Sequence, residues 1–221
     1  MIRLHHLEKS RSHRILWLLE TLELDYELVE YPRNSDGLAP ESLKRVHPLG
    51  ASPVITDGEQ TLAESGAIIE YLLARYGEGR CQPEADDTAG WVNYRYWLHY
   101  AEGSLMPLLV MQLVFGQLPA QSPWPVRPVA KGINKAVNQR FLAPRLKQHL
   151  AMIETHLDRH DEFAPGWPSG ADIQMSFPLQ ALALSRSLDD YPGIAAFIRR
   201  IEEDAAWQRV VERAGPVSLP G

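Results

Sequence analysis

Hydrophobic side chains repeat with two different periods in the two parts of this sequence, and this change constrains the fold most strongly. Up to about residue 76, short runs of alternating apolar and polar residues are separated by stretches of helical spacing. From residue 89 onward, every periodic stretch has helical spacing only. We therefore predict an α/β domain over residues 1–78, a linker over residues 79–88 and an all-helical domain over residues 89–221.

The first three elements follow from the pattern at the N-terminus. Alternation over residues 2–7 and over residues 26–31 predicts two strands, and an apolar stripe over residues 15–22 predicts an amphipathic helix between them. Because strand–helix–strand crossovers are right-handed, the two strands should be parallel neighbours. The chain therefore begins with a βαβ unit.

A second set of elements completes the α/β domain. Residues 41–46 predict a short helix, and the runs on either side of Asp57-Gly58 predict two short strands joined by a tight turn. The stripe over residues 69–76 predicts another helix. The resulting order βαβαββα is most economically packed as a mixed four-stranded sheet with helices on both faces.

Helical patterns account for the remaining chain. Apolar stripes lie within residues 91–115, 126–160 and 194–201. Between the first two patterns, residues 116–125 are rich in proline, which predicts a non-helical connection.

Composition excludes several classes of function. The 221 residues are 45% hydrophobic, and 28 acidic residues outnumber 22 basic ones, so the formal charge of -6 gives no surface suited to nucleic acid. We find no signal-peptide pattern and no uninterrupted apolar run near the roughly 18 residues that cross a bilayer, so we expect a cytoplasmic protein without a membrane partner. The single cysteine, Cys81, can form no internal disulfide.

Three histidines share one face of a predicted helix and could suggest a metal site. His149, His156 and His160 lie at i, i+7 and i+11. The sequence has neither the HExxH pattern nor a nearby cysteine, so a polar helix face is the favoured interpretation. We expect no metal.

Three local motifs carry a resemblance to a known family. They are Ser52-Pro53-Val54 before a predicted strand, Leu62-Ala63-Glu64-Ser65-Gly66-Ala67-Ile68 at the start of a predicted helix, and Ser169-Gly170-Ala171-Asp172-Ile173 in the helical part. With their order and spacing, the chain resembles the cytosolic glutathione S-transferase family over essentially its whole length. The loop Leu7-Glu8-Lys9-Ser10-Arg11-Ser12 with Trp17 is most similar to the serine-type fungal and bacterial branch. The resemblance implies a thioredoxin-like domain followed by an all-α domain.

The resemblance also implies how glutathione would bind. Ser65 would hold the γ-glutamyl carboxylate, Glu64 would contact the γ-glutamyl ammonium region, and Ser52 before a cis Pro53 would present its backbone to the cysteinyl part. A helix N-terminus attracts carboxylates physically, which supports this position for Ser65. The alternatives are a plain helix cap at Glu64-Ser65 and an ordinary trans proline.

Activation of glutathione requires a stabilised thiolate, because the thiolate is the nucleophile. A hydroxyl donating to sulfur would lower the thiol pKa, which assigns this role to Ser10, with Ser12 as the second candidate. N-capping of the first helix is the alternative role for both serines. The loop contains no cysteine, so the protein resembles the conjugating classes more than thioltransferases. It contains no tyrosine either.

The residues that bind the glycine carboxylate of glutathione and those that bind the electrophile remain to be considered. Many relatives have a cation where this chain has Ala51, so another group must hold the glycine carboxylate of glutathione. The candidates are Lys44, Arg45, His47 and Arg33.

For the electrophile, adaptable methionines and flat aromatic rings of the helical part suit varied apolar molecules. These are Tyr94, Trp97, Met106 and Met111. The segment from Gly116 to Pro128 fits a lid over this site or a surface connection equally well.

The third motif predicts a structural feature. Ser169 should cap a helix starting near Gly170, while Asp172 should accept a hydrogen bond from the Ser169 N–H group. Such a reciprocal box would stabilise the helical domain and take no part in chemistry.

The function expected from the resemblance is a glutathione transferase that activates the glutathione thiol for attack on hydrophobic electrophiles in detoxification, with organic hydroperoxide reduction as a further activity. Alternatives are a non-catalytic ligand- or partner-binding protein of the same fold and a glutathione-dependent isomerase, dehalogenase or ether-cleaving enzyme. The same thiolate would serve all these reactions. The family also implies a homodimer.

Overall fold

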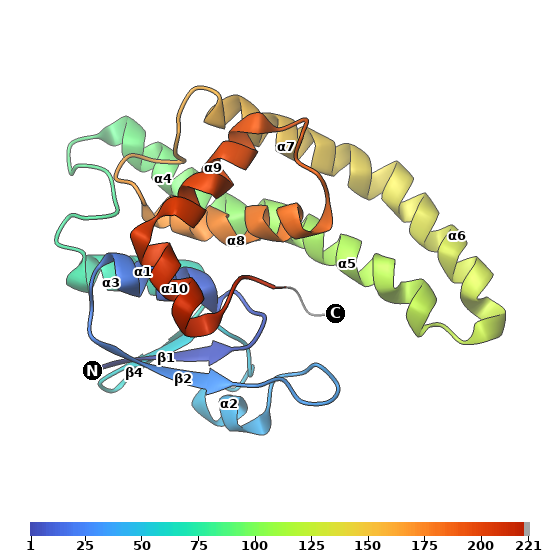
Figure 1. Ribbon diagram of the computed structural model, residues 1–221, viewed down its shortest axis with the longest axis horizontal. Coiled ribbons are helices and arrows are strands. Elements are labelled where there is room, and N and C mark those ends of the chain that lie inside the picture. The colour runs from blue at the N-terminus through green and yellow to red at the C-terminus, as the bar shows by residue number, and fades with distance from the viewer. Residues whose placement is uncertain (219–221) are drawn as a thin grey trace.

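The computed structural model describes residues 1–218 as a sheet-containing N-terminal part against which a helical C-terminal part packs (Figure 1). The N-terminal elements are β1 (Ile2–Leu7), α1 (Ser12–Thr21), β2 (Tyr26–Tyr31), α2 (Glu41–Val46), β3 (Val54–Asp57), β4 (Gln60–Ala63) and α3 (Ser65–Tyr76). The predicted order βαβαββα is confirmed.

The four strands form one mixed sheet in the order β2-β1-β3-β4. β1 and β2 are parallel, with Ile2 opposite Tyr26, as the crossover rule predicts. β3 and β4 are antiparallel, with Asp57 opposite Gln60, so the Asp57-Gly58 turn is also confirmed. In Figure 1, α2 lies on one side of the sheet, and α1 and α3 lie on the side that faces the helical part.

Helices make up the C-terminal part. They are α4 (Thr88–Tyr100), η1 (Ala101–Leu105), α5 (Met106–Gln121), η2 (Trp124–Val126), α6 (Arg127–Val137), η3 (Asn138–Leu142), α7 (Ala143–Leu157), α8 (Gly170–Ser185), α9 (Pro192–Glu203) and α10 (Ala205–Ala214). The π-helical turns η1 and η3 join α4 to α5 and α6 to α7 without a break. The distal ends of α5 and α6 form a hairpin that extends away from the other elements (Figure 1).

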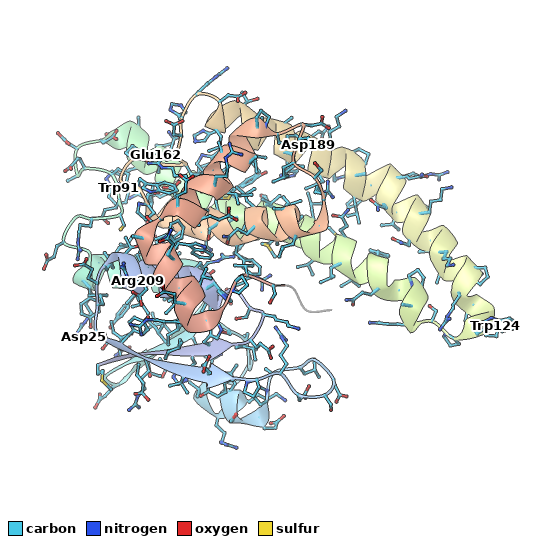
Figure 2. The ribbon with its side chains drawn as sticks, viewed as in Figure 1. Asp25, Trp91, Trp124, Glu162, Asp189 and Arg209 are labelled. Atoms are coloured by element: carbon cyan, nitrogen blue, oxygen red, sulfur yellow. The ribbon has the colours of Figure 1, made fainter. Side chains whose placement is uncertain are left out.

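The prediction of a non-helical connection over residues 116–125 is wrong for most of that segment. Helix α5 continues through Gln121 with Pro119 inside it. A proline removes one backbone donor, and an exposed helix tolerates this loss because water can bond the freed carbonyl. The chain turns only after Ser122, and Trp124 lies at the tip of the hairpin with 80% of its surface exposed (Figure 2).

The core joins the two parts through α1, α8 and α10. Trp17 of α1 is fully buried, its ring centroid lies 5.5 Å from that of Trp207, and its indole N–H group donates to Asp204 at 3.0 Å. Every residue of α8 from Gly170 to Leu182 is buried. These contacts fix the N-terminus of α1 at the boundary between the sheet and the helical part.

The helical stretch Thr88–Gln121 is both long and apolar. Its length and a mean hydropathy of 1.3 over the most apolar window would suffice to cross a bilayer, and only 17% of that window is buried in the structure. The stretch contains no uninterrupted apolar run of that length, so a search of the sequence for such runs does not find it.

Candidate functional site

Three segments that are far apart in the sequence meet at the N-terminus of α1. The Ser10 hydroxyl, just before α1, donates to the Ser52 hydroxyl at 3.3 Å. The Ser52-Pro53 peptide bond is cis, as the resemblance implies. One turn into α1, Arg14 Nη1 donates to Ser65 Oγ at 3.2 Å, at the first residue of α3. The structure thus brings Ser10, Ser52 and Ser65 to one site.

The direction of the hydrogen bonds around Ser10 follows from counting protons. Ser52 donates its hydroxyl proton to the His5 carbonyl at 3.0 Å, so it must accept from Ser10. Ser10 then accepts from the Ser12 hydroxyl at 2.8 Å, and Ser12 accepts from His6 Nδ1 at 2.7 Å. The chain therefore requires a proton on His6 Nδ1 and points the Ser10 proton toward the cis-proline loop.

Both serines are buried, and their positions separate their roles. Ser12 is fully buried in the first turn of α1, where its hydroxyl contacts His6, whereas Ser10 lies in the preceding loop. Burial, with a further contribution from His13, lowers the pKa of His6 to about 4, so His6 is neutral near pH 7. Neither serine is the N-cap residue of α1, which is Arg11. A neutral, fixed His6 keeps the hydroxyl chain in one direction across the neutral pH range.

Arg14 is a functional candidate that the sequence analysis did not single out. Its side chain is completely buried, and Nη1 donates to Glu102 Oε1 at 2.8 Å as well as to Ser65. The Arg14 Nε and Nη2 atoms are buried without a partner. Burial lowers the pKa of Arg14 to about 10, although the negative charge of Glu102 acts against this shift. The guanidinium therefore stays charged near pH 7.

A signal for Arg14 was present in the sequence. It is a basic residue directly before the apolar stripe that starts at Ile15 in α1, and a buried cation needs a partner anion. Its protein partner, Glu102, lies 88 positions further along the chain, and no local pattern connects the two.

The start of α3 has unusual backbone geometry. Glu64, the residue before α3, has φ 71 and ψ 116, and its side chain makes no capping hydrogen bond. A non-glycine residue in this sparsely populated region costs roughly 1–3 kcal/mol and commonly marks a functional site. Ser65 follows with 4% of its surface exposed. A capping role alone therefore does not account for Glu64.

The four cations considered for the glycine carboxylate have different surroundings. Arg33 donates to the backbone carbonyls of Glu8, Lys9 and Gly37. Lys44 forms an exposed ion pair with the Glu41 carboxylate. Arg45 is exposed on α2, and His47, just after α2, has a buried Nδ1 atom without a partner.

The residues expected at the electrophile site do not lie together. A cavity of about 370 Å³ lies between α5 and α8, and Met106 and Phe177 are among its lining residues. Tyr94 and Trp97 are buried in the core of the helical part, where the Trp97 ring lies 4.8 Å from that of Phe163. Met111 is half-buried on α5 and does not line the cavity. Periodicity alone could not separate core residues from cavity residues on α4 and α5.

The two parts of the predicted lid segment, Gly116 to Pro128, have different surroundings. Gly116 and Gln117 line the cavity between α5 and α8. The segment beyond them forms the exposed hairpin tip around Trp124 (Figure 2). Only the first two residues therefore border the candidate electrophile site.

The reciprocal capping box is present at the N-terminus of α8. Ser169 Oγ accepts from the Asp172 N–H group at 3.2 Å, and the Asp172 carboxylate accepts from the Ser169 N–H group at 2.8 Å. The same carboxylate also accepts from the Phe163 N–H group at 2.7 Å. The box therefore ties the loop before α8 to the helix.

Two of the three histidines considered as metal ligands form hydrogen bonds with other groups. His149 bonds to the Tyr100 hydroxyl, and His156 lies 3.0 Å from the Glu162 carbonyl. Within residues 1–218 the structure contains no group of three or more His, Cys, Asp or Glu side chains arranged to hold a metal ion.

Comparisons with known proteins agree with this arrangement. Residues 1–74 match the family described as "Glutathione S-transferase, N-terminal domain". Glutathione S-transferase 1 of Saccharomyces cerevisiae is 34% identical over 97% of this chain and 95% of its own length. Glutathione S-transferase 3 of Schizosaccharomyces pombe is also 34% identical, over 96% of this chain and 88% of its own. A solved glutathione S-transferase from Actinobacillus pleuropneumoniae has 34% identity and a TM-score of 0.81, covering 99% of this chain and 95% of that one.

A thioredoxin-like sheet domain with a cis-proline loop, joined to a helical domain, defines a class of two-domain α/β and all-α proteins. Within that class, the chain belongs to the glutathione S-transferase family.

Proposed function

We propose that this protein is a glutathione transferase that activates the glutathione thiol for attack on hydrophobic electrophiles. The observation that carries the proposal is the convergence of Ser10, the Ser52-Pro53 loop and the Arg14–Ser65 pair at one site. The curated relatives that match over nearly the whole chain bear the same activity in their names. Residues 1–78 would bind glutathione and residues 89–221 would supply the electrophile site.

Glutathione would bind with its γ-glutamyl carboxylate at the start of α3. Ser65 offers a hydroxyl and backbone N–H groups with the positive end of the helix dipole. Arg14 adds a buried charge whose Nε and Nη2 atoms have no partner among residues 1–218. Glu64 would face the γ-glutamyl ammonium group, and the strained backbone at Glu64 supports a binding role.

The remaining parts of glutathione would follow the edge of the sheet. Ser52 and Pro53 would pair with the cysteinyl backbone. For the glycine carboxylate we propose His47, because its buried Nδ1 lacks a partner while Arg33 and Lys44 are engaged with other groups. This assignment replaces the cation that many relatives have at the position of Ala51.

The hydroxyl chain would stabilise the thiolate. The bond that the Ser10 hydroxyl donates to Ser52 is long, at 3.3 Å, and a thiolate could replace Ser52 by accepting the same proton. Ser12 and His6 would act behind Ser10 as positioning residues, because they fix which way the Ser10 proton points. Stabilising the thiolate relative to the thiol lowers the thiol pKa.

The reaction is a nucleophilic attack by sulfur. On an aryl halide, a carbon–sulfur bond forms, the carbon–halogen bond breaks and halide leaves. On an organic hydroperoxide, sulfur forms a bond to the terminal oxygen, the oxygen–oxygen bond breaks and the alcohol leaves; a second glutathione thiol then converts the sulfenic acid to glutathione disulfide and water. Methionine and aromatic side chains such as Met106 and Phe177 would accept varied apolar substrates. We place this activity in cytoplasmic detoxification.

We further propose a homodimer formed through the long helical hairpin. Several apolar side chains of α5 and α6 are exposed, including Val114 at 58% and Val129 at 61%, and clusters of exposed apolar side chains are typical of interfaces between chains. A second copy would cover this surface and would explain why so little of the apolar stretch Thr88–Gln121 is buried. Sedimentation should give twice the 25.0 kDa chain mass, and a monomeric mass in buffer without detergent would contradict this proposal.

The activity is tested with a panel of glutathione-dependent reactions. Aryl halides, organic hydroperoxides, isothiocyanates and disulfides are offered with glutathione, and glutathione binding is measured by calorimetry. Turnover of at least one apolar electrophile is expected. Glutathione binding without any turnover would contradict catalysis, and absence of glutathione binding would favour a partner-binding protein of this fold.

A further inference from the structure

The cavity between α5 and α8 extends away from the proposed thiolate site. Its near end is formed by Met106 and Phe177, and the Phe177 ring lies 5.3 Å from the Arg14 guanidinium. Met106 follows Glu102, the partner of Arg14, by one helical turn. The near end of the cavity therefore borders the residues proposed to bind glutathione.

The far end of the same cavity is formed by a charged residue. Arg186 follows the last residue of α8 and lines the cavity with Ser185 and Gln117. At a rise of about 1.5 Å per residue, Phe177 and Arg186 are separated by roughly 13 Å along α8. The walls between them are mainly apolar, with Leu109, Val110, Leu113 and Ala181 among the lining residues.

The charge of Arg186 is not neutralised within the described part of the chain. Its Nη2 donates to the neutral Gln112 side chain at 3.1 Å, and its Nε is buried without a partner. No carboxylate among residues 1–218 forms an ion pair with it, although Asp189 and Asp190 are close in sequence. A guanidinium with a free buried donor at the end of an apolar cavity is suited to bind an anion.

We infer that the preferred electrophile is an elongated apolar molecule with a carboxylate at the end remote from its reacting carbon, and that Arg186 binds this carboxylate. This inference rests on the proposed transferase function. The apolar chain would lie between α5 and α8, the reacting carbon would lie near Phe177, and the carboxylate would accept hydrogen bonds from the Arg186 guanidinium. Arg186 is thus a residue that determines specificity.

An unsaturated aldehyde illustrates the reaction class. The glutathione sulfur forms a bond to the β-carbon, the electron pair of the carbon–carbon double bond moves to the α-carbon, and a proton from water completes the addition. No oxidant or reductant is consumed. A long trans-2-alkenal that ends in a carboxylate has the required apolar body, reactive carbon and anion.

The test compares this carboxylated alkenal with its methyl ester. In the wild type, kcat/KM should be about ten-fold or more higher for the carboxylate, since a charge-assisted hydrogen bond to a partly buried guanidinium distinguishes the two. In Arg186→Gln the ratio of kcat/KM for the carboxylate to kcat/KM for the methyl ester should fall close to one. Arg186→Lys should retain part of the preference for the carboxylate. Arg140→Gln, which removes an exposed charge in η3, should keep the wild-type ratio.

A binding measurement separates this inference from the proposed activity. Calorimetry with dodecanoate and dodecanol needs no turnover, and the wild type should bind dodecanoate more tightly whereas Arg186→Gln should not distinguish them. If this difference appears but neither an alkenal nor any electrophile of the panel above reacts with glutathione, the anion site stands and the transferase function is refuted. If the wild type binds dodecanoate no more tightly than dodecanol, the inference is overturned. It is also overturned if Arg186→Gln keeps a wild-type preference for dodecanoate, whether or not glutathione reacts.

Discussion

Replacing Glu102 by glutamine tests the buried charge at the centre of the site. Arg14 is completely buried and its hydrogen bond to Glu102 is 2.8 Å long, so Glu102→Gln leaves a buried guanidinium without a counter-charge. Breaking a fully buried pair costs about 3–5 kcal/mol. The Glu102 side chain is 32% exposed, and the glutamine oxygen can still accept from Arg14. We therefore expect a loss of about 2 kcal/mol in the free energy of unfolding.

Urea denaturation at pH 7 measures this loss, with Glu202→Gln on the exposed face of α9 as the control for a changed net charge. Saturating glutathione should narrow the difference between Glu102→Gln and the wild type, because its γ-glutamyl carboxylate supplies the missing negative charge. Cysteinylglycine lacks that carboxylate and should leave the difference unchanged. A loss within about 0.5 kcal/mol of the control would refute the reasoning about the buried guanidinium.

Two further variants test other parts of the structure. Asp172→Ala removes an acceptor of three hydrogen bonds, from the N–H groups of Ser169 and Phe163 and from the Ser169 hydroxyl. Thermal unfolding should therefore show a loss of about 3 kcal/mol in the free energy of unfolding. An unchanged melting temperature would contradict the structural role of Asp172. His6 has its pKa lowered to about 4 by burial, so its contribution to stability is present above pH 6.5 and is lost as the pH falls through 4, by about 3 kcal/mol in total. His6→Asn should reduce the acid destabilisation measured by urea titrations between these pH values, whereas His99→Gln at an exposed position should not; equal acid sensitivity of His6→Asn and the wild type would exclude a buried neutral histidine.

Much of the fold could be predicted from the sequence because its local signals agree with the global packing. The alternation in β1 and β2 and the Asp57-Gly58 turn specify pairings between segments that are close in sequence. The error at Pro119 has a physical cause: proline penalises a helix by a limited amount, and a helix that continues from a long apolar segment can accept that cost.

The candidate site was predicted less completely. The motifs around Ser10, Ser52 and Ser65 are local, and the structure brings them together. The Arg14–Glu102 pair spans the two parts of the molecule, so only the packing of α1 against the helical part reveals it. The same holds for the cavity, because apolar spacing shows that a side chain is buried without showing whether it meets a core or a cavity.

The hydroxyl of Ser10 as the activator of the glutathione thiol is the central claim, and the pKa of bound glutathione tests it most directly. The ultraviolet absorbance of the thiolate is titrated against pH for the wild type, Ser10→Ala and Ser12→Ala. We expect Ser10→Ala to raise the pKa by about one unit, equivalent to about 1.4 kcal/mol, and to lower turnover near neutral pH about ten-fold. Ser12→Ala should have a much smaller effect. A thiolate titration that is the same in Ser10→Ala and the wild type would contradict the claim and assign activation to another group, such as the backbone N–H groups or Arg11.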